Sequence, residues 1–191
     1  EQPDRTYELF AESFLQAKRF DEALAMFRKA EDIKRKPGLW GYQVARVEFE
    51  RGQFDAARKA LTIYLDENLT DAGVDPYELL ARVILEANPD PKAARKEIGE
   101  RLQELHDRFP ANDSLLFVLA DQYRVAGDDE RAEAAFQTLV RRQPTFDAWK
   151  GLRDVLRRQA KWDPLLHTLT DAARAESGEQ IAELVTPLAA D

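Results

Sequence analysis

The chain has 191 residues, 44% of them apolar, so it can bury a large hydrophobic core and fold without a partner. Its formal net charge of −8 disfavours general binding to nucleic acids and to anionic membrane surfaces, because both require a basic footprint. It contains no cysteine, which excludes disulfides, thiolate metal sites and thiol nucleophiles and leaves the redox compartment open.

A pattern of aromatic, acidic and small residues around Phe20 recurs around Phe54, 34 residues later. Related patterns begin at Gly127, 75 residues after Gly52, and at Ala160, another 33 residues on. A period of this length is typical of units made of two antiparallel helices joined by a tight turn. The spacings predict five such units, at residues 4–37, 38–71, 72–112, 113–146 and 146–179.

Small residues recur where the helices of these units must approach most closely. In the first helices these positions hold Ala11, Ala45, Ala81 and Ala120, and in the second helices Ala23, Ala57 and Ala132. Bulky residues such as Phe27 and Phe136 are expected to fill the space around them. We therefore expect all seven alanines to be buried.

Several units depart from the pattern, and the fifth has Leu165 and Leu169 in place of the usual alanine and aromatic residue. The second has Glu48 where a large aromatic residue is expected, so its first helix is expected to be slightly rotated. Residues 66–76 are predicted to form the longest loop. The third unit then reads as a helix over 77–87, a turn over 88–91 and an unusually long helix over 92–108.

The last segment, 179–190, places four apolar residues on one helical face: Ile181, Leu184, Val185 and Leu188. A stack of helix pairs exposes the apolar side of its last unit, and a terminal amphipathic helix commonly covers it. We expect this segment to be such a cap.

The fourth unit has seven residues at the spacing of the tetratricopeptide repeat: Leu119, Ala120, Tyr123, Gly127, Ala132, Phe136 and Pro144. The chain therefore resembles the tetratricopeptide repeat family over nearly its whole length, although Lys18 stands where the family usually has glycine. The resemblance implies an all-α fold, a right-handed α-solenoid of about five antiparallel helix pairs with a C-terminal capping helix. It implies a single domain over residues 1–191.

Signs of catalysis are lacking in the sequence. The two histidines, His106 and His167, each stand on a predicted helix without a second histidine at ligand spacing. Phosphate-binding loops, nucleophile elbows and metalloprotease motifs are absent as well. We expect no enzymatic activity, no metal site and no cofactor.

The resemblance also implies a site for a partner, because the first helices of tetratricopeptide units line a concave groove. Carrying the family's groove positions over predicts a site made of Tyr42, Arg46, Phe49, Arg82, Leu85, Phe117 and Arg124. Exposed apolar groups favour a binding surface, and arginine can hold a carboxylate bidentately. Two structural explanations stay open: the apolar groups pack against neighbouring helices, and the arginines pair with Glu8, Glu12, Glu50, Glu78 or Glu86.

The predicted function is a protein–protein interaction scaffold that binds a peptide or protein, favouring an acidic or carboxylate group, in its groove. Two alternatives stay open, namely self-assembly through Trp149, Trp162 and the 181–188 face, and a regulatory or anchoring role within a larger polypeptide. We expect no nucleic-acid binding and no membrane insertion, because no apolar run reaches about 18 residues. The first residues lack the features of a signal peptide, which favours the cytoplasm, but a removed signal stays compatible with a chain that begins without methionine.

Overall fold

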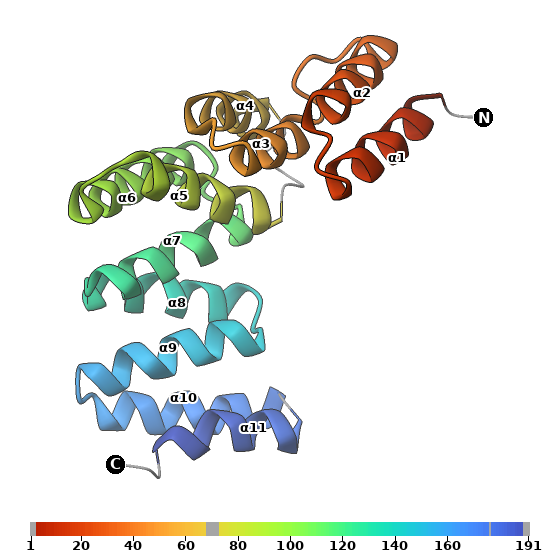
Figure 1. Ribbon diagram of the computed structural model, residues 1–191. Coiled ribbons are helices and arrows are strands. Elements are labelled where there is room, and N and C mark those ends of the chain that lie inside the picture. Colours follow the sequence, from red (N-terminus) through yellow and green to blue (C-terminus); the bar gives the residue numbers. More distant parts are fainter. Residues whose placement is uncertain (1–2, 68–72, 176, 189–191) are drawn as a thin grey trace. The chain divides into compact units, whose positions relative to one another are not determined.

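The computed structural model describes residues 3–67, 73–175 and 177–188, and within these ranges the chain is helical, without strands (Figure 1). The chain divides into two compact units, Glu1–Ile98 and Gly99–Asp191, which we call unit 1 and unit 2. The boundary between them falls inside one long helix. The five predicted helix pairs are all present, so the all-α fold of stacked pairs is confirmed.

Unit 1 contains two complete helix pairs and most of a third. The helices are α1 (Pro3–Gln16), α2 (Phe20–Lys34), α3 (Gly41–Glu50), α4 (Phe54–Glu67), α5 (Asp75–Ala87) and the first part of α6 (Pro91–Arg108). From α1 to α5, each helix contacts the next one along the chain.

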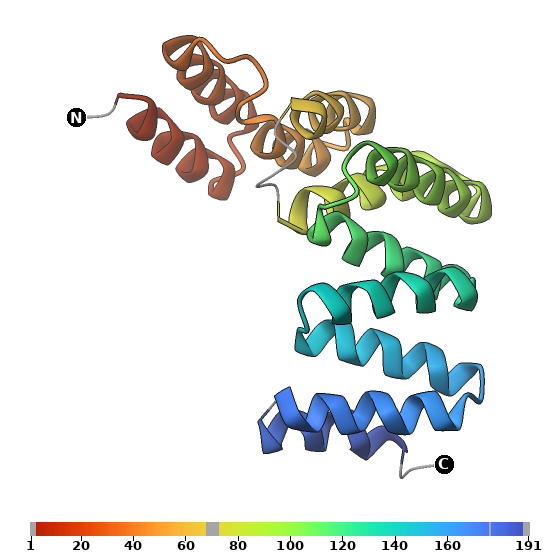
Figure 2. The ribbon, with the colours of Figure 1, turned by 180° about the vertical axis from the view of Figure 1, so that it is seen from behind.

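Unit 2 contains the rest of α6 and two further pairs, which lie side by side in chain order in both ribbon views (Figures 1 and 2). A short final helix follows them. The elements are α7 (Asp113–Ala126), α8 (Asp129–Arg142), α9 (Phe146–Arg158), α10 (Trp162–Ala175), α11 (Gly178–Val185) and the 3-10 helix η2 (Thr186–Leu188).

The close-contact alanines are buried as predicted, with at most 7% of any of them exposed. In four of the five pairs the turn contains one residue with left-handed backbone, namely Lys18, Gly52, Gly127 or Ala160. Lys18 therefore occupies the glycine position of the pattern with a φ of 57°. In the second pair Val47 is fully buried and Glu48 pairs with Arg51, while the slight rotation of α3 stays a prediction.

The third pair lies within two residues of its predicted bounds, and its second helix begins at Pro91, which the sequence places in the turn. The long second helix is present as α6, but α5 begins at Asp75, so Asp75 and Pro76 are helical rather than part of the predicted loop. Proline suits the first turn of a helix because its missing N–H has no partner there anyway. Asp66 is likewise helical, in α4, and residues 68–72 of that loop lie outside the described residues.

The C-terminal cap is also present. Leu184 is fully buried against Trp149 and Ala172, and Ser177 begins α11 with a capping box. Val185, expected to be covered with the rest of the apolar face, is instead 41% exposed. Residues 189–190 of the predicted cap lie outside the described residues.

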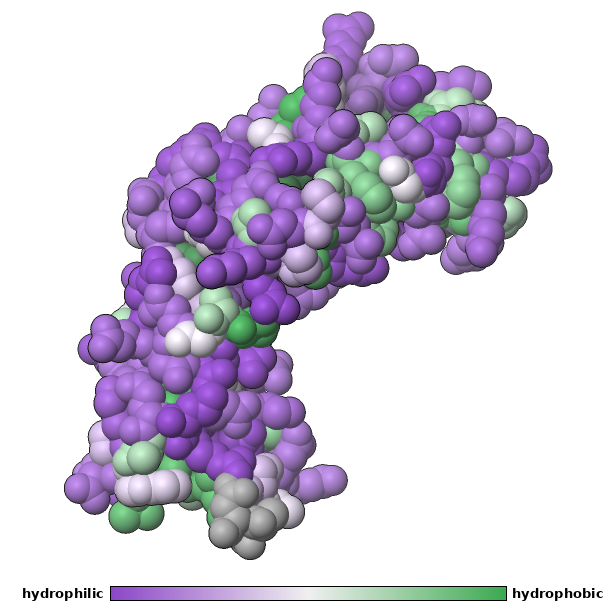
Figure 3. Space-filling model, turned by 60° about the vertical axis from the view of Figure 1, so that its left-hand side comes forward, coloured by the Kyte–Doolittle hydropathy of each residue, from purple (hydrophilic) through white to green (hydrophobic). Residues whose placement is uncertain are grey.

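Most of the surface seen in Figure 3 is hydrophilic, and the apolar side chains on it form small separate groups. Among the described residues, the most exposed large apolar side chains are Leu9, Phe10, Trp162 and Leu166, each more than half exposed. Single exposed apolar residues are ordinary in soluble proteins, so only pairs that share a face call for an explanation.

Candidate functional site

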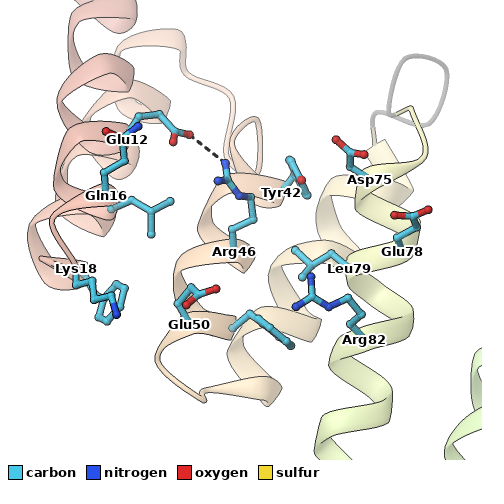
Figure 4. A pocket seen from close by; sticks show the side chains of 13 residues that line it. Glu12, Gln16, Lys18, Tyr42, Arg46, Glu50, Asp75, Glu78, Leu79 and Arg82 are labelled. Carbon is cyan, nitrogen blue, oxygen red and sulfur yellow. Dashed lines mark hydrogen bonds and ion pairs between the residues drawn. The ribbon is translucent and has the colours of Figure 1, made fainter.

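Unit 1 has a pocket of about 460 Å³ on the side formed by α1, α3 and α5 (Figure 4). These are the first helices of its three pairs, the ones that the sequence predicts to line a groove. The pocket is lined by Glu12, Leu15, Gln16, Lys18, Phe20, Tyr42, Arg46, Phe49, Glu50, Asp75, Glu78, Leu79 and Arg82.

Helical spacing brings these side chains to one side. Tyr42, Arg46 and Phe49 follow each other at four and three residues on α3, so they share a face. On α5 the residues that line the pocket are Asp75, Glu78, Leu79 and Arg82, which also follow each other at helical spacing. Two turns of each helix therefore supply most of the lining.

Close packing fixes α3 in place behind the pocket. A Cβ atom on Gly41 would lie 2.7 Å from Cβ of Tyr64 and 2.8 Å from the carbonyl oxygen of Ala60, so only glycine allows α3 this close to α4. The next residue, Tyr42, has its ring centre 6.4 Å from that of Tyr64. The aromatic side chain of Tyr42 is thus supported from behind and reaches the pocket with one face.

Arg46 has partners within the protein. Its Nη1 atom is 3.4 Å from Oε1 of Glu12, and its guanidinium lies 5.8 Å from the centre of the Tyr42 ring. The ion pair links α1 to α3 across the pocket, as the dashed line in Figure 4 shows. For Arg46 the structural explanation, pairing with a nearby glutamate, therefore applies.

Arg82 is placed differently. Its guanidinium lies 4.7 Å from the centre of the Phe49 ring, and it makes no ion pair within the described residues. The Phe49 ring is itself supported by Phe54, at 5.7 Å between ring centres. Stacking holds a guanidinium by its face and leaves the N–H groups at its edge available for a carboxylate.

Carboxylates gather around Tyr42. Burial raises the pKa of the Tyr42 hydroxyl, the negative charges of Asp75, Glu12 and Glu78 raise it further, and the charge of Arg46 opposes them. The hydroxyl therefore stays protonated at neutral pH and can donate a hydrogen bond. Asp75 and Glu78 make no ion pair within the described residues.

The pocket brings together four of the seven predicted site residues, Tyr42, Arg46, Phe49 and Arg82. Leu85 is on α5 but does not line the pocket, and 39% of it is exposed. Phe117 and Arg124 belong to unit 2, where Phe117 contacts Phe136 at 6.2 Å between ring centres and Arg124 Nε donates to Asp121 Oδ1 at 2.9 Å. Phe117 therefore packs against a neighbouring helix and Arg124 pairs with an acidic residue, so a structural role accounts for both.

Sequence reasoning missed several lining residues. Leu79 and Asp75 could have been found from the face they share with Arg82, once α5 is known to begin at Asp75. Lys18 and Phe20 come from the turn between α1 and α2, which the first-helix rule does not cover. Two of the missed residues are charged, Lys18 positively and Asp75 negatively, so the pocket carries more charge of both signs than the sequence predicts.

The described parts of the chain hold no group of three or more histidines and carboxylates arranged to bind a metal ion. In the same parts, no helix combines the length and the apolar character needed to cross a membrane.

Comparison with protein families and solved structures gives a consistent result. Two profiles of the tetratricopeptide repeat match residues 42–113 and 114–145, which together are more than half of the chain. Curated protein sequences yield no match. The structure is similar to TTC0263, a thermophilic TPR protein of Thermus thermophilus, with a TM-score of 0.61 and 15% identity, covering 97% of this chain and 98% of that one.

Two further solved structures have the same fold. YrrB, described as a TPR protein with an unusual peptide-binding site, has a TM-score of 0.59 and 16% identity over 95% of this chain and 90% of its own. MamA has a TM-score of 0.57 and 14% identity over 97% of this chain and 93% of its own. Repeated family matches, the helix pairs and the buried alanines agree: the chain belongs to the tetratricopeptide repeat family.

Proposed function

We propose that the pocket of unit 1 binds an extended peptide segment of a partner protein. Tetratricopeptide repeats generally act as protein-interaction scaffolds rather than as enzymes. The observation that carries the proposal is the guanidinium of Arg82, stacked on Phe49 in an open pocket without an ion pair among the described residues. A cation held in this way is ready to bind a carboxylate.

The floor of the pocket supports the same interpretation. Leu15, Tyr42 and Phe49 are partly exposed and supply apolar surface, and the buried Leu79 completes the apolar lining. Binding energy at protein interfaces is concentrated in aromatic and arginine side chains that sit in such pockets. A peptide can bury its apolar side chains here while its charged groups meet Arg82 and the carboxylates.

Rigidity favours binding as well. The lining residues stand on helices, and α3 is held against α4 by the close contact at Gly41. A preformed site spares the ordering cost on the protein's side, so more of the contact energy appears as affinity.

YrrB, whose description names a peptide-binding site, has the same fold. At 16% identity this likeness concerns the fold alone, so the peptide-binding role of the present pocket rests on its own residues.

A peptide selection tests the proposal. The purified protein is used to select peptides of about eight residues from a randomised display library, and dissociation constants of the winners are measured by fluorescence anisotropy. We expect Phe49→Ala with Arg82→Glu to weaken binding by roughly tenfold or more, because it removes an aromatic and an arginine anchor together.

Two controls separate binding from folding. Arg28→Glu makes the same charge change on the exposed side of α2, outside the pocket lining, and should leave the dissociation constants unchanged. Arg82→Glu alone avoids the loss of the contact between Phe49 and Phe54. Selected peptides that bind all of these variants equally well would show that the pocket is not the site.

Self-association is a second candidate, in a revised form. Two residues of the predicted interface are covered within the chain, since Trp149 is 6% exposed and Leu184 fully buried, whereas Val185 is 41% exposed. Trp162 and Leu166, however, are 61% and 65% exposed and lie one turn apart on α10. Light scattering over a concentration series tests this candidate: an oligomer that Trp162→Ser with Leu166→Ser converts to monomer would support it, and a concentrated monomer would exclude it.

A further inference from the structure

The two ends of the unit 1 pocket differ in charge. Figure 4 shows Asp75 and Glu78 on the first turn of α5, at the end where Tyr42 and Glu12 lie, and Lys18 and Arg82 at the other end. Of the three carboxylates at the first end, only Glu12 is paired, with Arg46. This end, which we call the acidic end, thus keeps two negative charges that no described residue neutralises.

The other end, which we call the basic end, contains Lys18, Arg82 and the carboxylate of Glu50. None of the three forms an ion pair within the described residues. Two cations against one carboxylate leave an excess of one positive charge. A single guest with both signs of charge is therefore more complementary to the pocket than a purely acidic one.

Asp75 and Glu78 also stabilise α5, because negative charges are favourable at a helix N-terminus. That role does not require them to face the pocket. Both line the pocket, and Figure 4 shows them at the end where Tyr42 lies; their negative charges accordingly help to raise the pKa of the Tyr42 hydroxyl. They are accordingly available to a cation of the guest that enters this end of the pocket.

The distance between the ends can be expressed in residues of the guest. Asp75 and Arg82 are seven residues apart on α5, which at 1.5 Å per residue is about 10 Å. An extended peptide advances about 3.3 Å per residue, so this distance corresponds to roughly three residues. Leu79 lines the pocket between the two ends, with 6% of it exposed.

We infer that the pocket is specific for an extended peptide that carries a lysine or arginine and, about three positions away, an aspartate or glutamate, with apolar residues between them. The cation binds at Asp75 and Glu78, and the carboxylate binds at Arg82. An extended peptide can lie in either direction, so either order of the two charges is expected. This inference rests on the proposed function, since it names the partner chemistry of the same pocket.

The test extends the library selection to two single-site variants, Glu78→Gln and Arg82→Gln. With the wild-type protein, selected peptides should be enriched in opposite charges about three positions apart. Selection on Glu78→Gln should lose the enrichment of lysine and arginine only, and selection on Arg82→Gln should lose that of aspartate and glutamate only. The controls are Glu86→Gln, further along α5 and outside the lining, and Arg28→Gln on α2.

Affinities of individual peptides, acetylated and amidated to remove terminal charges, make the test quantitative. Glu78→Gln should weaken a peptide that carries both charges about three- to fivefold, as expected for a partly exposed ion pair. Arg82→Gln should weaken it roughly tenfold, because guanidinium–carboxylate bonds are charge-assisted. Both effects should shrink in about 1 M salt.

The outcomes separate the two proposals. Peptides that show no charge enrichment, but lose affinity for Phe49→Ala with Arg82→Glu, would overturn the charge pattern and leave peptide binding in the pocket intact. Peptides enriched in acidic residues alone would also overturn it. Selection of no binder, or of binders indifferent to every pocket variant, would overturn both.

Discussion

The arginines on the first helices are used differently in the two units. In unit 1, Arg82 lies over Phe49 without an ion pair among the described residues. In unit 2, Arg124 is paired with Asp121, and Arg153 is only 4% exposed and donates to Asp154 and to the backbone carbonyls of Glu183 and Leu184. Arg82 therefore serves an open pocket, whereas Arg124 and Arg153, like Arg46 of unit 1, serve internal cohesion.

The neighbouring residues explain this difference only in part. Arg124 and Arg153 each have an aspartate within three residues that their guanidinium reaches. Arg82 also has an acidic residue one turn away, Glu78, yet its guanidinium lies over the Phe49 ring. Opposite charges at helical spacing thus permit an ion pair but do not require one. For Arg82, the contact with the Phe49 ring takes the place of an ion pair with Glu78.

The largest expected effect concerns Arg153. Replacing it by leucine removes its bonds to Asp154 and leaves two carbonyls at the end of α11 without their donor. We expect Arg153→Leu to lower the free energy of unfolding of unit 2 by about 3 kcal/mol, because it leaves the backbone carbonyls and the partly buried carboxylate of Asp154 without their charged donor. Denaturant unfolding followed by tryptophan fluorescence measures it, since Trp149 lies under the cap.

Arg174→Leu is the matched control, because Arg174 is a largely exposed arginine of the same unit, paired only with Asp171 three residues before it. It should change the stability by less than about 0.5 kcal/mol. If Arg153→Leu were as mild as this control, the buried guanidinium would not hold the cap, and the contrast between the units would weaken.

The sequence predicts the fold well because its signals are local and repeated. The 34-residue period and the alanine positions identify the helix pairs, and even the irregular third pair has the expected long second helix. The shared face of Tyr42, Arg46 and Phe49 likewise follows from helical spacing.

The charges of the pocket are less predictable. Asp75 was missed because Asp75 and Pro76 read as loop residues, whereas both belong to the first turn of α5. The partner of each arginine depends on side-chain packing between helices, which a single sequence does not specify. For the same reason the burial of Arg153 has no sequence signal, and neither does the separation of Phe117 and Arg124 into unit 2.

The second prediction tests whether the contrast is limited to the arginines. A methyl group on Gly151 would overlap three carbons of the buried Phe136 ring, the farthest at 2.8 Å. We expect Gly151→Ala to destabilise unit 2 by about 2 kcal/mol, because the ring has no free space to move into. Thermal or denaturant unfolding measures the loss.

Gly41→Ala is the corresponding change in unit 1, where a Cβ would meet Tyr64 and the backbone of Ala60. A similar loss in both variants would show that the helices pack equally tightly in the two units and that only the arginine chemistry differs. A mild effect of Gly41→Ala alone would instead point to a looser unit 1.

The third prediction concerns acid stability, because both histidines are in unit 2. Burial lowers the pKa of His106 below 6.5, the charge of Arg142 lowers it further, and the charges of Asp107 and Asp113 oppose this. Its Nδ1 atom is buried and makes no hydrogen bond within the described residues. The unfolded chain therefore takes up the proton more readily, so His106 should reduce the stability of unit 2 as the pH falls below 6.5.

Unfolding curves of the wild type and of His106→Gln, measured between about pH 7 and pH 5, test this effect. The wild type should lose more stability than the variant over that range, and the difference should arise in unit 2. Parallel curves for the two proteins would mean that His106 is protonated equally easily in the folded and unfolded states.

The smallest expected effect returns to Arg82. Arg82→Gln should change the free energy of unfolding by less than about 0.5 kcal/mol, because the side chain is exposed and gives up a single stacking contact. The same variant should weaken the selected peptides, so stability and binding separate at this residue. A loss above about 1 kcal/mol would mean that Arg82 holds unit 1 together as Arg153 holds unit 2, and its weaker peptide binding would then reflect a disturbed pocket rather than a lost anchor.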